Sequence, residues 1–284
     1  MGKKCFSSDL WRKKSIHFVL SDCPQDEVLA QGPKVLVTGA TGLLGRAVCR
    51  EFQSHGWVVT GTGFRRARPR FLRCDLTDED AVRRLLQEYK VKLFTGIYVF
   101  VFSRRRDNRT GSVARQGLKH VRLEAFYTKP SAVILRVPVL FGEVESVMES
   151  AVTSLWQKVQ EATEESCPMD HFMQRFPTDA RDVATVCRKL AERDPSIRGI
   201  FHFSGKEQMT KYEMAVAMAQ AFNLPSNHLI PVTGSTPRPI NSQLNCSRLE
   251  LLNLSVEPRA FSTSIVECLW PFTADKRWRQ TVFH

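Results

Sequence analysis

Residues 38–45 read TGATGLLG, a glycine-rich stretch between two apolar patterns of different period. Before it, the β-branched run KVLVT of Lys34–Thr38 is typical of a buried strand. After it, apolar residues recur at every fourth position until Gly56, as on the buried side of a helix. A strand, a glycine-rich turn and a helix in this order predict a Rossmann-type dinucleotide-binding unit over residues 34–66.

The three glycines of this stretch have different expected roles. Gly39 permits a tight turn, Gly42 lets the backbone approach a pyrophosphate, and Gly45 lets the helix pack closely on the strand. The amides and positive dipole end of the helix N-terminus would then bind phosphate. The alternative is a glycine-rich turn without a ligand, which the strand-turn-helix context disfavours.

The choice of cofactor is expected just after a second predicted strand, Trp57–Thr62. NAD enzymes place an acidic residue there for the ribose 2′-hydroxyl. This chain has Arg65 and Arg66 instead, and a guanidinium binds a 2′-phosphate through two parallel hydrogen bonds. The sequence therefore predicts NADP, the alternative being a solvated basic turn.

A third strand is expected over Phe71–Leu76, and its last residues, Asp75 and Leu76, are placed to meet the adenine. Thr77 is predicted to cap the helix that follows, with Asp80 at the capping-box position. This order of strands and helices predicts the α/β class, with a parallel doubly wound sheet.

The middle of the chain departs from that pattern. Val133–Val139 again predicts a buried strand, but only residues 91–132 precede it, where a doubly wound fold has two more β-α units of roughly 30 residues each. Residues 91–131 are also strongly basic. An internal deletion or splice product that leaves a disordered insert is favoured over a purposeful basic binding loop.

The remaining chain has few unusual features. Residues 1–32 lack a periodic pattern and are interpreted as a tail, residues 33–273 as the NAD(P)-binding domain with a small C-terminal lobe, and residues 274–284 as an interaction tail. In the lobe, Thr210 and Glu213 predict a capping box. The formal net charge is +12, but no nucleic-acid motif, membrane span, secretory signal or metal cluster accompanies it. Eight scattered cysteines favour a reducing compartment.

Several longer motifs carry a resemblance to known families. Three of them resemble the extended short-chain dehydrogenase/reductase superfamily, namely TGATGLLG, the arginine pair and CDLTD (Cys74–Asp78). Others are similar to dTDP-4-dehydrorhamnose reductases: LRVPVLFGE (135–143), GIFHFSGKEQMTKYEMA (199–215) and RPINSQLNCSRLE (238–250). A third set resembles the regulatory beta subunits of methionine adenosyltransferase: FRRARPRF (64–71), RDVATVCRKLAE (181–192) and WPFTADKRWRQTVFH (270–284). The match covers roughly residues 15–90 and 132–284.

The resemblance to the beta-subunit family implies a non-catalytic partner of the catalytic subunit, which modulates S-adenosylmethionine synthesis and holds NADP. It implies a cytoplasmic location, with the nucleus as a second one. The cofactor contacts that it carries over are Thr41, Gly42, Leu43, Leu44, Phe64, Arg65, Arg66, Asp75, Leu76 and Leu140. Interface residues are expected in the aromatic and basic C-terminal tail, at Trp278, Arg279, Val282, Phe283 and His284.

Catalytic residues are not expected. The superfamily uses a Tyr-x-x-x-Lys pair, in which the Lys lowers the Tyr pKa for proton exchange. The four tyrosines are followed four residues later by Leu93, Phe102, Ser131 and Val216, so the sequence contains no such pair. The alternative function is an active NADP-dependent dTDP-4-dehydrorhamnose reductase-like enzyme, which this absence disfavours.

Overall fold

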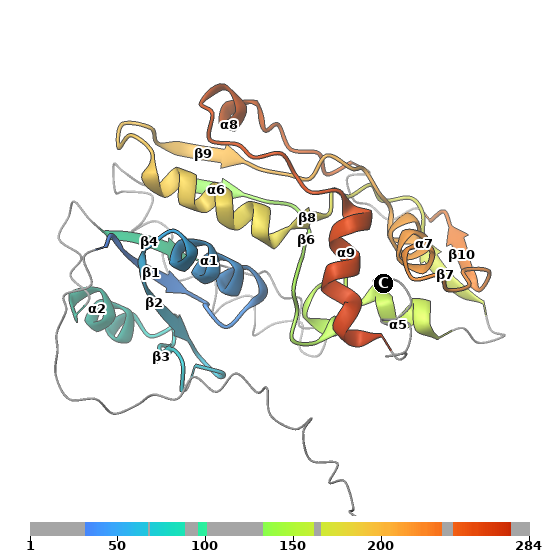
Figure 1. Cartoon of the computed structure of the whole chain (residues 1–284), viewed down its shortest axis with the longest axis horizontal. Helices are drawn as coiled ribbons and strands as arrows, with labels where there is room; N and C mark the ends of the chain where they lie inside the picture. The colour runs from blue at the N-terminus through green and yellow to red at the C-terminus, as the bar shows by residue number, and fades with distance from the viewer. Residues whose placement is uncertain are drawn as a thin grey trace, which may run out of the picture. The chain divides into compact units, whose positions relative to one another are not determined.

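The computed structural model describes residues 32–67, 69–88, 96–100, 133–161, 166–234 and 241–273 (Figure 1). All of these residues belong to one compact unit, Gly32–His284. Every pair of named strands is parallel, as expected for the α/β class.

One sheet forms around the predicted first strand. Its order is β3-β2-β1-β4, and its strands are β1 (Lys34–Thr38), β2 (Val58–Gly63), β3 (Leu72–Arg73) and β4 (Gly96–Phe100). The bounds of β1 match the prediction, β2 begins one residue later than expected, and β3 is shorter. A parallel sheet that opens with a strand-turn-helix unit confirms the predicted fold class at this end of the chain.

Helices cover both faces of this sheet. Val35 and Val37 point to one face and pack in a cluster with α1 (Leu43–Ser54), whereas Leu36 points to the other and packs with α2 (Glu79–Glu88). The alternation of side chains along a strand accounts for this division. The buried residues of α1 include Val48 and Phe52, which the helical period identifies.

The predicted cap of α2 was wrong by one residue. Asp78 Oδ1 accepts hydrogen bonds from the N–H groups of Asp80 and Ala81, both at 3.0 Å, and so caps the helix. Thr77 instead donates its N–H and hydroxyl to Asp75 Oδ1, at 2.9 and 2.7 Å. A carboxylate is a stronger acceptor than a hydroxyl, and Asp75 draws Thr77 into a local turn.

The later strands form separate pairs. They are β5 (Val133–Arg136) with β9 (Gly199–His202), β6 (Leu140–Phe141) with β8 (Thr178–Asp179), and β7 (Cys167–Asp170) with β10 (Leu229–Val232). The strand predicted over Val133–Val139 therefore ends early, at Arg136 of β5, and β6 begins just after the predicted range. Within the described ranges, no strand pairing joins β4 to β5. Among the described residues, the strands thus form one four-stranded sheet and three separate pairs.

The remaining helices are α5 (Leu155–Gln160), α6 (Ala180–Glu192), α7 (Lys211–Ala221), α8 (Ser247–Leu251) and α9 (Phe261–Leu269), with short 3₁₀ turns η1 (Val147–Glu149) and η2 (Trp270–Phe272). α6 lies beside α1 on the sheet (Figure 1). The predicted capping box of α7 is present, because Thr210 and Glu213 each accept a hydrogen bond from the other's N–H.

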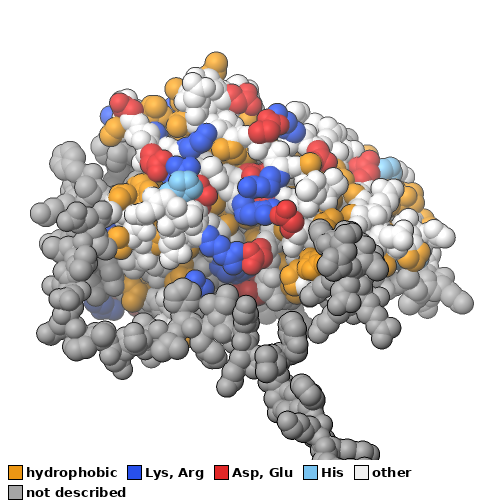
Figure 2. Space-filling model, in the orientation of Figure 1, with side chains coloured by type: hydrophobic (Ala, Val, Ile, Leu, Met, Phe, Trp, Pro, Cys, Tyr) orange, Lys and Arg blue, Asp and Glu red, His pale blue; other side chains and the backbone are white. Residues whose placement is uncertain are grey.

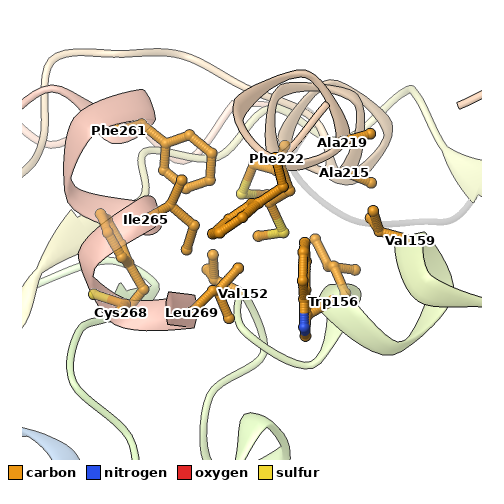
Figure 3. Close-up of a cluster of buried hydrophobic side chains, with 14 of the residues drawn as sticks. Val152, Trp156, Val159, Ala215, Ala219, Phe222, Phe261, Ile265, Cys268 and Leu269 are labelled. Atoms are coloured by element: carbon orange, nitrogen blue, oxygen red, sulfur yellow. The ribbon is translucent and has the colours of Figure 1, made fainter. Parts of the chain in front are cut away.

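Helices α5, α7 and α9 enclose one apolar core, the small C-terminal lobe (Figure 3). The ring of Trp156 from α5 lies 4.6 Å from that of Phe222 at the end of α7, tilted by 54°, and Phe261 of α9 lies 5.2 Å from Phe141 of β6. In the part of the chain that the structure describes, no helix is long and apolar enough to cross a bilayer. The same residues contain no cluster of three or more metal-ligating side chains.

Candidate functional site: the glycine-rich loop

The loop after β1 is a tight turn fixed by backbone hydrogen bonds. Gly39 has a φ of +65°, which favours glycine. Its carbonyl accepts from the N–H of Gly42 at 3.0 Å, and Ala40 N–H donates to the carbonyl of Thr62 in β2 at 2.8 Å. The turn is therefore held by the sheet as well as by itself.

The other two glycines differ in why they lack a side chain. A Cβ at Gly45 would lie 2.0 Å from the Gly39 carbonyl oxygen, so the packing of α1 on the turn requires glycine. A Cβ at Gly42 would meet only that same oxygen, at an ordinary 3.5 Å. The described residues do not exclude a side chain at Gly42, so its place in the motif fits close approach by a ligand.

The N-terminus of α1 begins at this loop and is not capped by a side chain. Gly42 is its N-cap, the cap makes no side-chain hydrogen bond, and the first turn contains no acidic residue. Free N–H groups and the positive end of the helix dipole attract anions. The loop and helix therefore fit the phosphates of a dinucleotide.

The predicted site residues meet at the carboxyl edge of the sheet. The pairings Thr62↔Leu72 and Gly63↔Arg73 place the end of β3 beside that of β2, and Cys74 N–H donates to the Gly63 carbonyl at 2.9 Å. Phe64–Arg66 and Asp75 leave the sheet from these neighbouring ends. Ligands of open α/β sheets bind at this edge.

The basic turn after β2 is accessible. Phe64 is 44% exposed, and the guanidinium of Arg73 lies 5.6 Å from its ring centroid. Arg65 is exposed and has no ion pair within the described residues. Its charge is available to an anion from solvent.

Arg66 is also exposed, but its guanidinium has partners. Nη2 donates to the Thr41 carbonyl at 3.0 Å, and Nη1 pairs with Oε2 of Glu145. Glu149 Oε1 lies 3.6 Å from Nη2. Arg66 thus connects the glycine-rich loop to the segment between β6 and α5.

The carboxylate of Glu149 accepts three hydrogen bonds in this segment. Arg46, in the first turns of α1, donates to both of its carboxylate oxygens, at 2.9 and 2.7 Å, and the N–H of Glu145 donates at 3.0 Å. Burial alone would raise the pKa of Glu149, but these donors outweigh burial and hold the pKa below its ordinary value. The carboxylate therefore stays ionised beside the loop.

The other residues predicted to contact the cofactor make structural contacts within the chain. Asp75 accepts from Thr77, and these hydrogen bonds lower its pKa. The side chain of Leu76 packs on the cluster around Leu36, and those of Leu44 and Leu140 pack on the cluster beside α6. Contacts between these leucines and a cofactor stay predictions.

The sequence did not single out the ion pairs of Arg46, Glu145 and Glu149. Arg46 directly follows Gly45 and Glu145 lies just past the FGE motif, but neither motif indicates a contact across about one hundred residues. Tail residues Trp278, Arg279, Val282, Phe283 and His284 lie outside the described residues, as does most of the basic segment 91–131.

A cavity of about 850 Å³ lies elsewhere, at the carboxyl end of β9. Residues 203–206, 243–247 and 255–258 contribute most of its lining, and none of the predicted cofactor residues does. On the face drawn in Figure 2, basic and acidic side chains around α1 and α6 are intermingled.

Two family models match consecutive parts of the chain. Residues 111–274 match the family described as RmlD substrate binding domain, and residues 35–98 match the NAD dependent epimerase/dehydratase family. A solved dTDP-4-dehydrorhamnose reductase from Bacillus anthracis in complex with NADP is 16% identical with a TM-score of 0.65, covering 85% of this chain and 99% of that one. A second such protein, from Clostridium acetobutylicum, is 18% identical with a TM-score of 0.64, covering 84% and 99%. These likenesses establish the reductase-like Rossmann fold.

Sequence relatives are much closer. Methionine adenosyltransferase 2 subunit beta of Danio rerio is 47% identical over 319 positions, covering 92% of this chain and 97% of the relative. The mouse protein of that name is 43% identical over 335 positions, covering 96% and 98%. Since 92% of 284 residues is about 261, about 58 positions of the Danio rerio protein have no counterpart here, roughly the length of two β-α units. The chain belongs to the family of methionine adenosyltransferase 2 beta subunits.

Proposed function

We propose that this chain is a non-catalytic regulatory subunit, which binds the catalytic subunit of methionine adenosyltransferase and holds NADP at the glycine-rich loop. The observation that carries the proposal is its 47% identity to a protein named as a beta subunit of that enzyme, over nearly the whole relative. We place it in the cytoplasm, with the nucleus as a second location.

The glycine-rich loop supports the cofactor part of the proposal. The uncapped N-terminus of α1 would hold the pyrophosphate, and Arg65 with Arg66 would hold the ribose 2′-phosphate. NADP would supply redox chemistry to a reductase. Here no Tyr-x-x-x-Lys pair exists in the 284 residues to exchange the proton, so a structural or regulatory ligand is the better interpretation.

The first experiment tests association. Purified chain and catalytic subunit should co-elute on size exclusion, and removal of residues 275–284 should abolish co-elution while the melting temperature changes by only a few degrees. Trp278→Ala and Phe283→Ala should each weaken association by about 2 kcal/mol if they are interface anchors. Full affinity without the tail would place the interface elsewhere.

The second experiment tests the cofactor. Isothermal titration should give tighter binding of NADP than of NAD, and Arg65→Asp should reduce the difference by about 1.5–3 kcal/mol. Arg84→Asp, at an exposed position of α2, is the matched control, because it changes the charge by the same amount. Equal affinity of the parent chain for both dinucleotides would contradict the proposed preference.

The third experiment addresses the reductase alternative. NADPH oxidation with a dTDP-4-keto sugar should be at least about 10²–10⁴-fold slower than with an intact reductase, because general acid–base catalysis typically contributes that factor. Rapid turnover that survives replacement of all four tyrosines would reveal another proton donor and support the alternative.

A further inference from the structure

Arg66 is shared between the glycine-rich loop and a carboxylate. One side of its guanidinium donates to the Thr41 carbonyl at 3.0 Å, and the other pairs with Glu145. Neighbouring Arg65 has no ion pair within the described residues. When a phosphate arrives, Arg66 must therefore exchange one anionic partner for another.

The two glutamates beside Arg66 differ in how firmly they are held. Glu149 has a side chain only 15% exposed, and Arg46 and the N–H of Glu145 fix its carboxylate. The Glu145 side chain is 56% exposed, with Arg66 as its close partner and Arg46 at 3.8 Å. Glu145 can turn into solvent without uncovering the core, whereas Glu149 cannot.

We infer that Glu145 is a specificity-determining residue, which lowers the preference for NADP over NAD by competing with the ribose 2′-phosphate for Arg66. This inference rests on the proposed function, in which Arg65 and Arg66 hold that phosphate. A phosphate dianion requires the same donor edge of a guanidinium that a carboxylate uses, so the two anions compete for it. The neutral 2′-hydroxyl of NAD has no such conflict.

The experiment isolates the 2′-phosphate. Adenosine 2′,5′-bisphosphate and 5′-AMP are titrated into the full chain by isothermal calorimetry, for the parent and for Glu145→Gln. An exposed ion pair has a modest free energy, so the variant should bind the bisphosphate about two- to fivefold more tightly. Its affinity for 5′-AMP should stay within about twofold of that of the parent chain.

Two controls separate this effect from general electrostatics. Glu143→Gln removes a charge from the same segment. The Glu143 side chain is 60% exposed, close to the value for Glu145, but it pairs with Arg50 instead of Arg66. This variant should therefore leave the ratio of the two affinities unchanged. In an Arg66→Gln background, Glu145→Gln should no longer tighten binding of the bisphosphate. Tightening that persists there would overturn the inference.

The remaining outcomes distinguish the two proposals. If the parent chain binds the bisphosphate but Glu145→Gln leaves the ratio of bisphosphate to 5′-AMP affinity unchanged, the Glu145 inference alone is overturned. A parent chain that binds neither NADP nor the bisphosphate overturns the proposed cofactor and, with it, this inference.

Discussion

The C-terminal lobe and the sheet around β1 bury their apolar side chains in different ways. In the described residues, the lobe has sixteen buried residues in one cluster, whereas those beside the sheet strands form groups of eight, six and three. A continuous sheet would join the smaller groups through its central strands, but no pairing in the described part of the chain joins β4 to β5. We infer that the lobe is the more stable half and that the sheet depends more on its polar links.

Replacement of a lobe aromatic should have the largest effect. Trp156 is 1% exposed, and Trp156→Ala should lower the free energy of unfolding by about 3–5 kcal/mol, measured by urea denaturation. The comparison variant is Leu85→Ala in the smallest cluster, for which we expect about 2 kcal/mol. A greater loss from Leu85→Ala would reverse the ranking of the two halves.

A buried carboxylate joins the two halves. Asp179 caps α6 and accepts from Arg181 Nη2 and from the Ser264 hydroxyl of α9, both at 2.7 Å. Asp179→Ala should destabilise the chain by about 3 kcal/mol, because the guanidinium and the hydroxyl lose a buried partner. Ser264→Ala, which removes one neutral donor, should lower the free energy of unfolding by about 1 kcal/mol. Equal effects of both variants would show that the charge of Asp179 contributes nothing.

The glycines of the loop allow stability and binding to be separated. Gly45→Ala should destabilise the fold by about 1–3 kcal/mol, because its Cβ would lie 2.0 Å from a carbonyl oxygen. Gly42→Ala should leave the thermal midpoint nearly unchanged but lower NADP affinity by about tenfold, as a Cβ would occupy the expected path of the pyrophosphate. Normal NADP binding by Gly42→Ala would contradict the site.

The smallest effect concerns pH. The pKa of Glu149 is lowered in the folded chain, so its contribution is complete above the unfolded value of about 4.3 and is lost as the pH falls through the folded pKa. Glu149→Gln should therefore lower stability by about 1 kcal/mol at pH 7 and by almost nothing below the folded pKa. Glu257→Gln, in an exposed pair with Lys206, should change stability by only a few tenths of a kcal/mol at either pH. A loss from Glu149→Gln that persists at low pH would mean that its charge is not the cause.

Local patterns were enough to predict the elements but not their assembly. The period and β-branching of residues 34–52 predict β1 and α1, and the pair Thr210 and Glu213 predicts the cap of α7, because these features depend on neighbours in sequence. The cap of α2 was misassigned since Thr77 and Asp78 are both good caps, and the choice depends on Asp75. Long-range ion pairs leave no such local pattern.

The Arg46–Glu149 hydrogen bonds join residues that are synthesised at different times. The two residues are 103 positions apart, and a ribosome adds about 5–20 residues per second. Arg46, beside the glycine-rich loop, is therefore synthesised about 5–20 s before its acidic partner. Arg46 and Arg66 are made before residues 145–149, so their guanidiniums lack these carboxylate partners until that segment has been synthesised.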